Sequence, residues 1–119
     1  MCGLAGYFVP QPIEGWRKLG DIAILMAKAL KSRGPDDSGV WFDESAGVAL
    51  AHQRLSVVDL STAGHQPMVS KSGQSVIVYN GEVFNFPELR KELEKDGIPF
   101  TSHSDTEVIL EGCEKWEVS

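Results

Sequence analysis

Short apolar segments with two different periodicities alternate along this chain, and this alternation restricts its fold more than any other feature. Four strand-like runs are predicted, the last of them rich in β-branched residues: 3–9, 40–42, 47–52 and 75–79. Three helices are predicted from apolar residues spaced three and four positions apart: 21–31, 86–96 and 105–116. Interleaved strands and helices predict a mixed α/β domain with packed layers.

Turn and capping residues support these boundaries. Gly34-Pro35 stops the first helix, and the polar turn at 43–45 predicts a hairpin between the second and third strands. Residues 53–75 are predicted to be largely irregular. Asn85 is a predicted N-cap, and the segment Ser104-Asp105-Thr106-Glu107 has the spacing of a capping box.

The charge balance argues against several kinds of partner. The 119 residues carry 11 basic and 17 acidic side chains without a basic cluster, so nucleic acid and anionic membrane surfaces are poor partners. No apolar run approaches ~20 residues, which argues against a membrane-spanning helix. The first ten residues lack the features of a secretory signal, and we expect one domain or less in the cytoplasm.

The two cysteines, Cys2 and Cys113, have neither the number nor the spacing of a disulfide framework or a metal site. Cys113 falls on the apolar stripe of the third predicted helix, so we predict a thiol buried in the core. The three histidines, His52, His65 and His103, show no metal-ligand spacing. A Cys–His pair stays open, because no orienting residue singles out one histidine.

Cys2 follows the initiator methionine, and that position has a chemical consequence. Removal of Met1 would leave a residue that carries a thiol and a free α-amine on one carbon. A thiolate is a strong nucleophile, and an N-terminal amine with a pKa of about 7.7–8.0 suits proton transfer at neutral pH. One residue would then supply both nucleophile and base. The alternative is that Cys2 is a small apolar residue that opens a strand.

Three loops carry polar residues that packing does not require. Arg54 closes an apolar strand and offers a fork for a carboxylate, or else forms an ordinary salt bridge. Asn80-Gly81 offers a side-chain amide and an unobstructed N–H to an oxyanion, or else is only a turn. Asp105 at a helix start would bind an ammonium group, or else complements the helix dipole.

Six segments are more specific together than any of them alone. They are Met1-Cys2-Gly3, Arg33–Gly39, Arg54–Asp59, Gly64–Met68, Tyr79–Asn85 and Ser104–Glu107. Their order and approximate spacing resemble the N-terminal glutaminase domain of glutamine-hydrolysing asparagine synthetases, which are class II glutamine amidotransferases. The resemblance implies an α+β fold over residues 2–119. That fold is a four-layer αββα sandwich of the N-terminal-nucleophile hydrolase type, incomplete at the C-terminus.

The resemblance also implies a reaction and a set of site residues. Cys2 would attack the side-chain amide of L-glutamine and form a thioester, with release of ammonia and then of glutamate. Catalytic roles fall to Cys2, Asn80 and Gly81, the last two as oxyanion donors. Glutamine binding falls to a larger group: Arg54, Val57, Val58, Asn80, Gly81, Glu82 and Asp105. Neither a metal nor a cofactor is implied for this step.

Members of the family continue into an ATP-using synthetase domain, so ATP and Mg²⁺ are expected only in that domain, outside this sequence. The ammonia would then serve asparagine synthesis from aspartate. One alternative is another asparagine-synthetase-like amidotransferase, such as one that amidates surface polysaccharides. A second is a truncated, catalytically silent fragment, which we would expect to self-associate through open strand edges. A homodimer stays open for the full-length enzyme.

Overall fold

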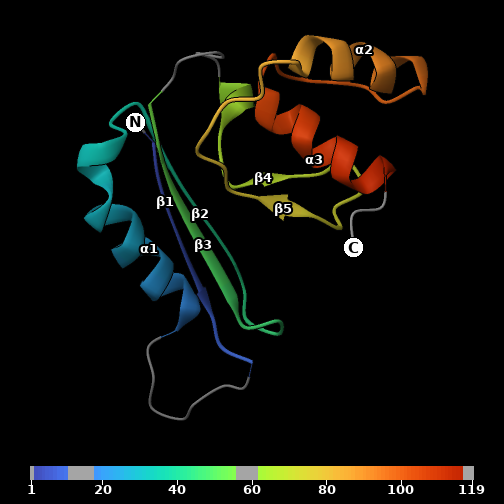
Figure 1. Ribbon diagram of the computed structural model, residues 1–119. Helices are drawn as coiled ribbons and strands as arrows, with labels where there is room; N and C mark the ends of the chain where they lie inside the picture. Colours follow the sequence, from blue (N-terminus) through green and yellow to red (C-terminus); the bar gives the residue numbers. More distant parts are fainter. Residues whose placement is uncertain (1, 11–17, 56–61, 117–119) are drawn as a thin grey trace.

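The predicted alternation of strands and helices is present and is divided between two antiparallel sheets (Figure 1). The computed structural model describes residues 2–10, 18–55 and 62–116. The helices are α1 (Leu19–Ala29), α2 (Phe86–Lys95) and α3 (Asp105–Lys115). The strands are β1 (Gly3–Phe8), β2 (Asp37–Asp43), β3 (Val48–Arg54), β4 (Met68–Val69) and β5 (Val76–Ile77). Two short 3₁₀ turns, η1 (Lys31–Arg33) and η2 (Thr62–Gly64), precede β2 and β4. The described residues thus form a small α+β domain.

The first sheet has the strand order β1-β3-β2, with both pairings antiparallel. β2 and β3 form the hairpin that was predicted across the turn at 43–45. β1 pairs with the other edge of β3, from Gly3 opposite Gln53 to Phe8 opposite Val48. This register brings the N-terminal end of β1 to the C-terminal end of β3.

Helix α1 lies along one face of this sheet (Figure 1). The contact is made by small residues, since Ala23 and Ala27 of α1 and Ala49 and Ala51 of β3 are all buried. The Gln53 side chain lies at the same interface and donates from Nε2 to the Ala27 carbonyl oxygen at 2.9 Å. The helix begins and ends two residues earlier than predicted, and Leu30 separates it from η1.

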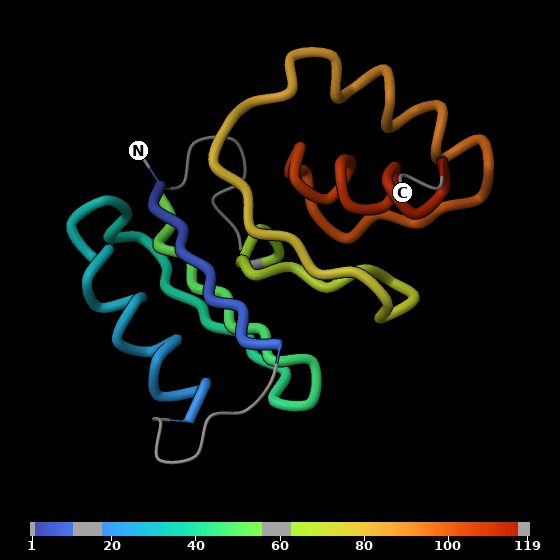
Figure 2. Tube along the Cα trace, turned by 60° about the horizontal axis from the view of Figure 1, so that its bottom comes forward, coloured from blue at the N-terminus to red at the C-terminus, as the bar shows by residue number. Residues whose placement is uncertain are grey.

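Helix α3 connects the second sheet to α2, because it contacts β4 and β5 as well as α2 (Figures 1 and 2). Leu93, Val108 and Leu110 are buried in this part of the core. Asn85 occupies the N-cap position of α2 as predicted, without a side-chain capping bond, and Gly97 follows the end of that helix with φ +86°. Among the described helices, none is long and apolar enough to cross a bilayer.

The strand predicted at 75–79 is shorter than expected, since β5 ends at Ile77. Side chains bind the backbone of Tyr79 in place of a neighbouring strand. Its N–H donates to Gln66 Oε1 at 2.7 Å, and its carbonyl oxygen lies 3.2 Å from His52 Nε2. A β-rich local sequence therefore leaves the sheet because other parts of the chain satisfy its backbone groups.

The predicted capping box at the start of α3 is half correct. The Ser104 hydroxyl accepts a hydrogen bond from the Thr106 N–H at 3.1 Å, as an N-cap residue should. The Glu107 carboxylate instead accepts bonds from the N–H groups of Thr101 at 3.0 Å and Ser102 at 2.8 Å. Glu107 therefore fixes the loop before α3 rather than the cap itself.

The prediction that Cys113 is buried was wrong, since its side chain is exposed. The buried side of α3 includes two carboxylates, Glu107 and Glu111, which are 3% and 6% exposed. Each accepts backbone hydrogen bonds from a loop, Glu111 from the Lys71 N–H at 2.9 Å. These bonds compensate the burial of polar groups and turn that side of the helix inward. Cys113 and Trp116 are left exposed.

Two glycines with left-handed backbones provide a test of how β1 is held against the hairpin. Gly47 has φ +72°, and a Cβ there would collide with the Val9 carbonyl oxygen. Gly73 has φ +77° with no atom within 4 Å of such a Cβ. We expect Gly73→Ala to cost about 1–2 kcal/mol from backbone strain alone. Gly47→Ala should cost about 3 kcal/mol or more, because the collision adds to that strain. Urea unfolding measures both, and equal losses would contradict the packing described here.

Candidate active site

Cys2 lies where β1 begins and β3 ends. The pairing of Gly3 with Gln53 places Cys2 beside the last residues of β3. The Leu55 N–H donates to Cys2 Sγ at 3.2 Å, and the Leu55 carbonyl oxygen lies 3.5 Å from the same sulfur. Cys2 is partly exposed, so its thiol is held by backbone groups yet remains accessible from solvent.

Asn80 reaches the same place from a distant part of the sequence. Its side-chain Nδ2 donates to the Cys2 carbonyl oxygen at 2.9 Å. The segment that follows β5 runs between β1 and α3 in both views (Figures 1 and 2). Gly81 follows at once, and a Cβ at that position would lie 2.7 Å from the Tyr79 hydroxyl oxygen. The structure therefore brings Asn80 to Cys2, while its role toward an oxyanion stays a prediction.

Arg54 is buried at the end of β3, with 7% of its surface exposed. Its guanidinium lies against Gly64 of η2, where any Cβ would collide with it. Gly34 fixes its backbone, because a Cβ at Gly34 would lie 2.5 Å from the Arg54 carbonyl carbon. The Arg54 carbonyl oxygen also accepts from the Asp36 N–H at 2.9 Å. The Gly34-Pro35-Asp36 segment thus supports Arg54 through close backbone packing.

Asp105 is 6% exposed at the first position of α3. Its Oδ2 accepts from the Val83 N–H at 2.9 Å, which fastens the helix start to the segment that carries Asn80 and Gly81. Glu82 lies between these points and is exposed. The remaining predicted site residues, Val57 and Val58, lie outside the described residues.

Two of the predicted site residues outside Tyr79–Val83, Cys2 and Asp105, are bonded to this segment. Asn80 bonds to Cys2 at one end of it, and Asp105 bonds to Val83 at the other. Arg54 is the last residue of β3 and directly precedes Leu55, whose N–H donates to the Cys2 sulfur. In the described parts of the chain, no three His, Cys, Asp or Glu side chains gather as metal ligands would.

Two buried polar residues next to this cluster carry roles that the sequence did not reveal. His52 is 1% exposed, and burial lowers the pKa of its imidazole below the ordinary value of 6.5. Gln66 is 7% exposed and donates from Nε2 to Thr106 Oγ1 at 3.2 Å while accepting from the Tyr79 N–H. Both bind the backbone of Tyr79. The available signals were a histidine in an apolar strand for His52 and the Gly64–Met68 segment for Gln66.

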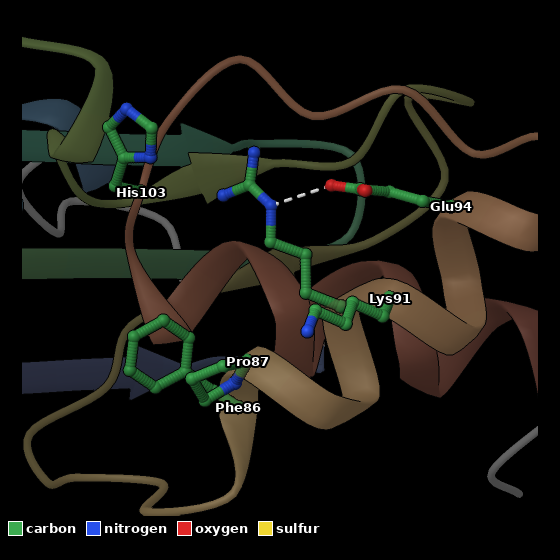
Figure 3. A pocket seen from close by; sticks show the side chains of 6 residues that line it. Phe86, Pro87, Lys91, Glu94 and His103 are labelled. Carbon is green, nitrogen blue, oxygen red and sulfur yellow. Dashed lines mark hydrogen bonds and ion pairs between the residues drawn. The ribbon is translucent and has the colours of Figure 1, made fainter.

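A separate open hollow of about 420 Å³ lies over α2 (Figure 3). Its lining comprises Phe86, Pro87, Arg90, Lys91, Glu94 and His103, none of which belongs to the predicted site. Arg90 donates to Glu94 Oε1 at 2.8 Å and to the Ser102 carbonyl oxygen at 2.6 Å, and its guanidinium lies 4.9 Å from the Phe100 ring centroid. These contacts give Arg90 a structural role between α2 and the loop before α3.

Comparison with known proteins identifies the class to which this arrangement belongs. The sequence profile of the glutamine amidotransferase domain matches residues 1–119. The chain therefore belongs to the glutamine amidotransferase domain family.

The similar proteins are much longer than this chain. "Asparagine synthetase [glutamine-hydrolyzing] 3" of Bacillus subtilis is 40% identical over 121 residues, covering 98% of this chain and 19% of that protein. "Probable asparagine synthetase [glutamine-hydrolyzing]" of Schizosaccharomyces pombe is 40% identical over 111 residues, covering 92% of this chain and 19% of that protein. "Amidase chry2" of Gibberella zeae is 38% identical over 78 residues, covering 66% of this chain and 12% of that protein. The chain thus spans about a fifth or less of these relatives.

Proposed function

We propose that this chain carries out the glutamine-hydrolysing half-reaction of an asparagine-synthetase-type amidotransferase. The observation that carries the proposal is the contact between Asn80 Nδ2 and the Cys2 carbonyl oxygen at 2.9 Å. It brings a nucleophile and an amide donor together from positions 78 residues apart in sequence. The family match and the asparagine synthetase relatives supply the reaction class.

The reaction would begin with removal of Met1, which frees the α-amine of Cys2. The Cys2 sulfur attacks the side-chain amide carbon of glutamine, and the thiol proton passes to the amine. The resulting tetrahedral intermediate collapses with cleavage of the C–N bond. The amine returns a proton to the departing nitrogen, and ammonia leaves. Water then hydrolyses the γ-glutamyl thioester, which yields glutamate and restores the thiol. The step proposed here uses no metal or cofactor.

The donors for the oxyanion are the Asn80 side chain and the Gly81 N–H. Among the described residues, the contact with the Cys2 carbonyl oxygen uses one of the two N–H bonds of the Asn80 amide. The second can serve a developing negative charge, where removal of one donor typically costs about 2.7–4 kcal/mol of transition-state stabilisation.

The proposed glutamine contacts come from opposite sides of the same cluster. Arg54 would bind the α-carboxylate, for which a buried guanidinium fork is well suited. Asp105 would bind the α-ammonium, since a carboxylate accepts several hydrogen bonds beyond the one from the Val83 N–H. Glu82, Val57 and Val58 would line the remaining pocket.

The wider setting follows from the relatives. We infer that the ammonia serves ATP-dependent asparagine synthesis from aspartate in a second domain, where ATP and Mg²⁺ would bind. We also infer that the glutaminase domain forms a four-layer αββα sandwich and that the protein lies in the cytoplasm. A homodimer of the full-length enzyme stays an open alternative. The alternative is another asparagine-synthetase-like amidotransferase with a different ammonia acceptor.

Substitutions at the glutamine contacts and at the oxyanion donor should separate binding from chemistry. We expect Arg54→Ala and Asp105→Asn each to lower kcat/KM by a factor that corresponds to about 2–5 kcal/mol, mainly through a higher KM. Asp105→Asn keeps an acceptor for the Val83 N–H, so its loss reports charge rather than structure. Asn80→Ala should instead lower kcat, because its hydrogen bond strengthens in the transition state. Steady-state glutaminase kinetics in the full-length protein provide the measurement. Absence of glutamine hydrolysis by the unsubstituted protein refutes the proposed function, and a pure KM effect of Asn80→Ala refutes the oxyanion role.

A further inference from the structure

His52 is the most deeply buried titratable side chain next to the cluster around Cys2. It lies on β3 and is 1% exposed. Its Nε2 atom lies 3.2 Å from the Tyr79 carbonyl oxygen. Its Nδ1 atom is also buried and has no hydrogen-bond partner among the described residues. A buried polar atom without a partner is uncommon, so the orientation of this ring calls for a physical reason.

The contact with Tyr79 fixes the tautomer of the ring. A carbonyl oxygen can only accept, so Nε2 must carry the proton and donate it. Nδ1 is then an unprotonated acceptor. This neutral form leaves one acceptor unsatisfied, whereas the imidazolium would place an unpaired N–H and a charge in the same buried position.

The surroundings of the ring also favour its neutral form. Burial lowers the pKa of His52 most strongly, and the positive charge of Arg54 on β3 and that of His65 after η2 lower it further. The Tyr79 carbonyl oxygen and the carboxylate of Asp37 at the start of β2 act in the opposite direction. Asp37 is itself paired with His65 Nδ1 at 2.5 Å.

The Tyr79 carbonyl is one of several points, among the described residues, that hold the segment carrying Asn80. Gln66 Oε1 accepts from the Tyr79 N–H at 2.7 Å, His52 binds the Tyr79 carbonyl oxygen, and Asn80 Nδ2 reaches the Cys2 carbonyl oxygen at 2.9 Å. The His52 bond fixes the peptide plane from which Asn80 follows. A displacement of about 1 Å there would misplace both proposed oxyanion donors, and such errors typically cost about 10²-fold in rate.

We propose that neutral His52 is a positioning residue, which holds the Tyr79–Gly81 segment against β3 and so keeps Asn80 and Gly81 beside Cys2. Its effect on turnover rests on the proposed function, whereas the contact itself does not. Protonation of His52 would keep the Nε2–H donor but would place a charge and an unpaired Nδ1–H in the buried site, which favours separation of the segment from the ring. The segment should therefore loosen as the pH falls below 6.5 toward the lowered pKa of His52.

Three variants of the full-length protein test this role. His52→Leu removes the donor. His52→Gln keeps an N–H donor at the position that corresponds to Nε2 but cannot titrate. The matched control is Gln53→Leu at the next residue of β3. It removes the bonds that Gln53 Nε2 donates to the Ala27 carbonyl oxygen of α1 and to Ser38 Oγ of β2. Gln53 takes no part in the proposed chemistry.

Kinetics distinguish positioning from general stability. We expect His52→Leu to lower kcat at least about tenfold with KM changed less than about threefold. His52→Gln should retain most of kcat and lose the part of the acidic decline that belongs to His52. In an Asn80→Ala background, His52→Leu should lower kcat less than it does alone, because only the Gly81 donor is then left to be misplaced. Additive losses in the double variant, or an equal loss of kcat in Gln53→Leu, would overturn the proposal.

Hydrogen–deuterium exchange tests the contact without any need for activity. Peptides that cover 78–83 should exchange at least about tenfold faster in His52→Leu, since opening of the segment becomes easier. They should be unchanged in His52→Gln and Gln53→Leu. Unchanged exchange in His52→Leu overturns the proposal. If the unsubstituted protein hydrolyses no glutamine, the proposed function fails, and the exchange measurement still decides whether His52 holds the segment.

Discussion

Cys2→Ala should abolish glutamine hydrolysis while glutamine binding persists. The substitution removes the only atom proposed to form a bond with the substrate, so we expect kcat to fall by at least about 10⁴-fold. Binding should survive because Arg54 and Asp105, which would hold the α-carboxylate and α-ammonium, lie on other elements. Release of glutamate measures the first effect, and calorimetric titration with glutamine measures the second.

Cys113→Ser is the matched control for this thiol. Cys113 is exposed on α3, so exchange of its sulfur for oxygen should leave turnover unchanged. It should change the free energy of unfolding by no more than about 0.5 kcal/mol. An alkylating glutamine analogue should label the unsubstituted protein and Cys113→Ser with one molecule per chain, seen as an increase in intact mass. It should not label Cys2→Ala. Labelling at Cys113 with retained turnover in Cys2→Ala would show that the nucleophile has been misassigned.

Residues inserted between Met1 and Cys2 should have a comparably large effect. The insertion turns the α-amine of Cys2 into a peptide N–H, which can no longer accept a proton. Proton transfer by a positioned group typically contributes about 10²–10⁴-fold, so we expect a loss of turnover in that range. Intact-mass spectrometry should show that the unmodified protein has lost Met1, while the extended protein retains its insertion.

A control for the extension is the Cys2 thiol itself. Its reaction with a small, uncharged alkylating agent at high pH, where thiols ionise without assistance, should be similar in both proteins. Undiminished glutamine turnover in the extended protein would contradict the N-terminal-nucleophile mechanism and would favour a base elsewhere, such as a histidine.

Local periodicity predicted the elements well where the deciding interactions are local. The spacing of apolar residues located all three described helices, and the polar turn located the β2–β3 hairpin. Two details failed because distant groups decided them. The strand at 75–79 ends at Ile77 since Gln66 and His52 bind the backbone of Tyr79. Cys113 is exposed because the buried side of α3 includes carboxylates that accept hydrogen bonds from loops, and this side faces away from Cys113.

The candidate site was predictable only through the joint occurrence of its segments. No periodicity links Cys2 with Asn80 or Val83 with Asp105, because these contacts depend on the register of β1 against β3 and on the path after β5. Gly34 belongs to the Arg33–Gly39 segment, but its close packing against the Arg54 backbone is visible only in three dimensions. His52 was considered only as a metal ligand or as a partner for a cysteine. A polar residue in an apolar strand gives no indication of the carbonyl that it will bind.

The long sequence separations around Cys2 have a consequence for the order of events during synthesis. Leu55 and Asn80, which contact Cys2, follow it by 53 and 78 residues. At a translation rate of about 5–20 residues per second, Asn80 is made roughly 4–16 s after Cys2. Until Asn80 is made, its contact with Cys2 cannot form. The removal of Met1 that the proposed mechanism requires therefore has a time window on the ribosome, before Asn80 can reach the Cys2 carbonyl and crowd the new N-terminus.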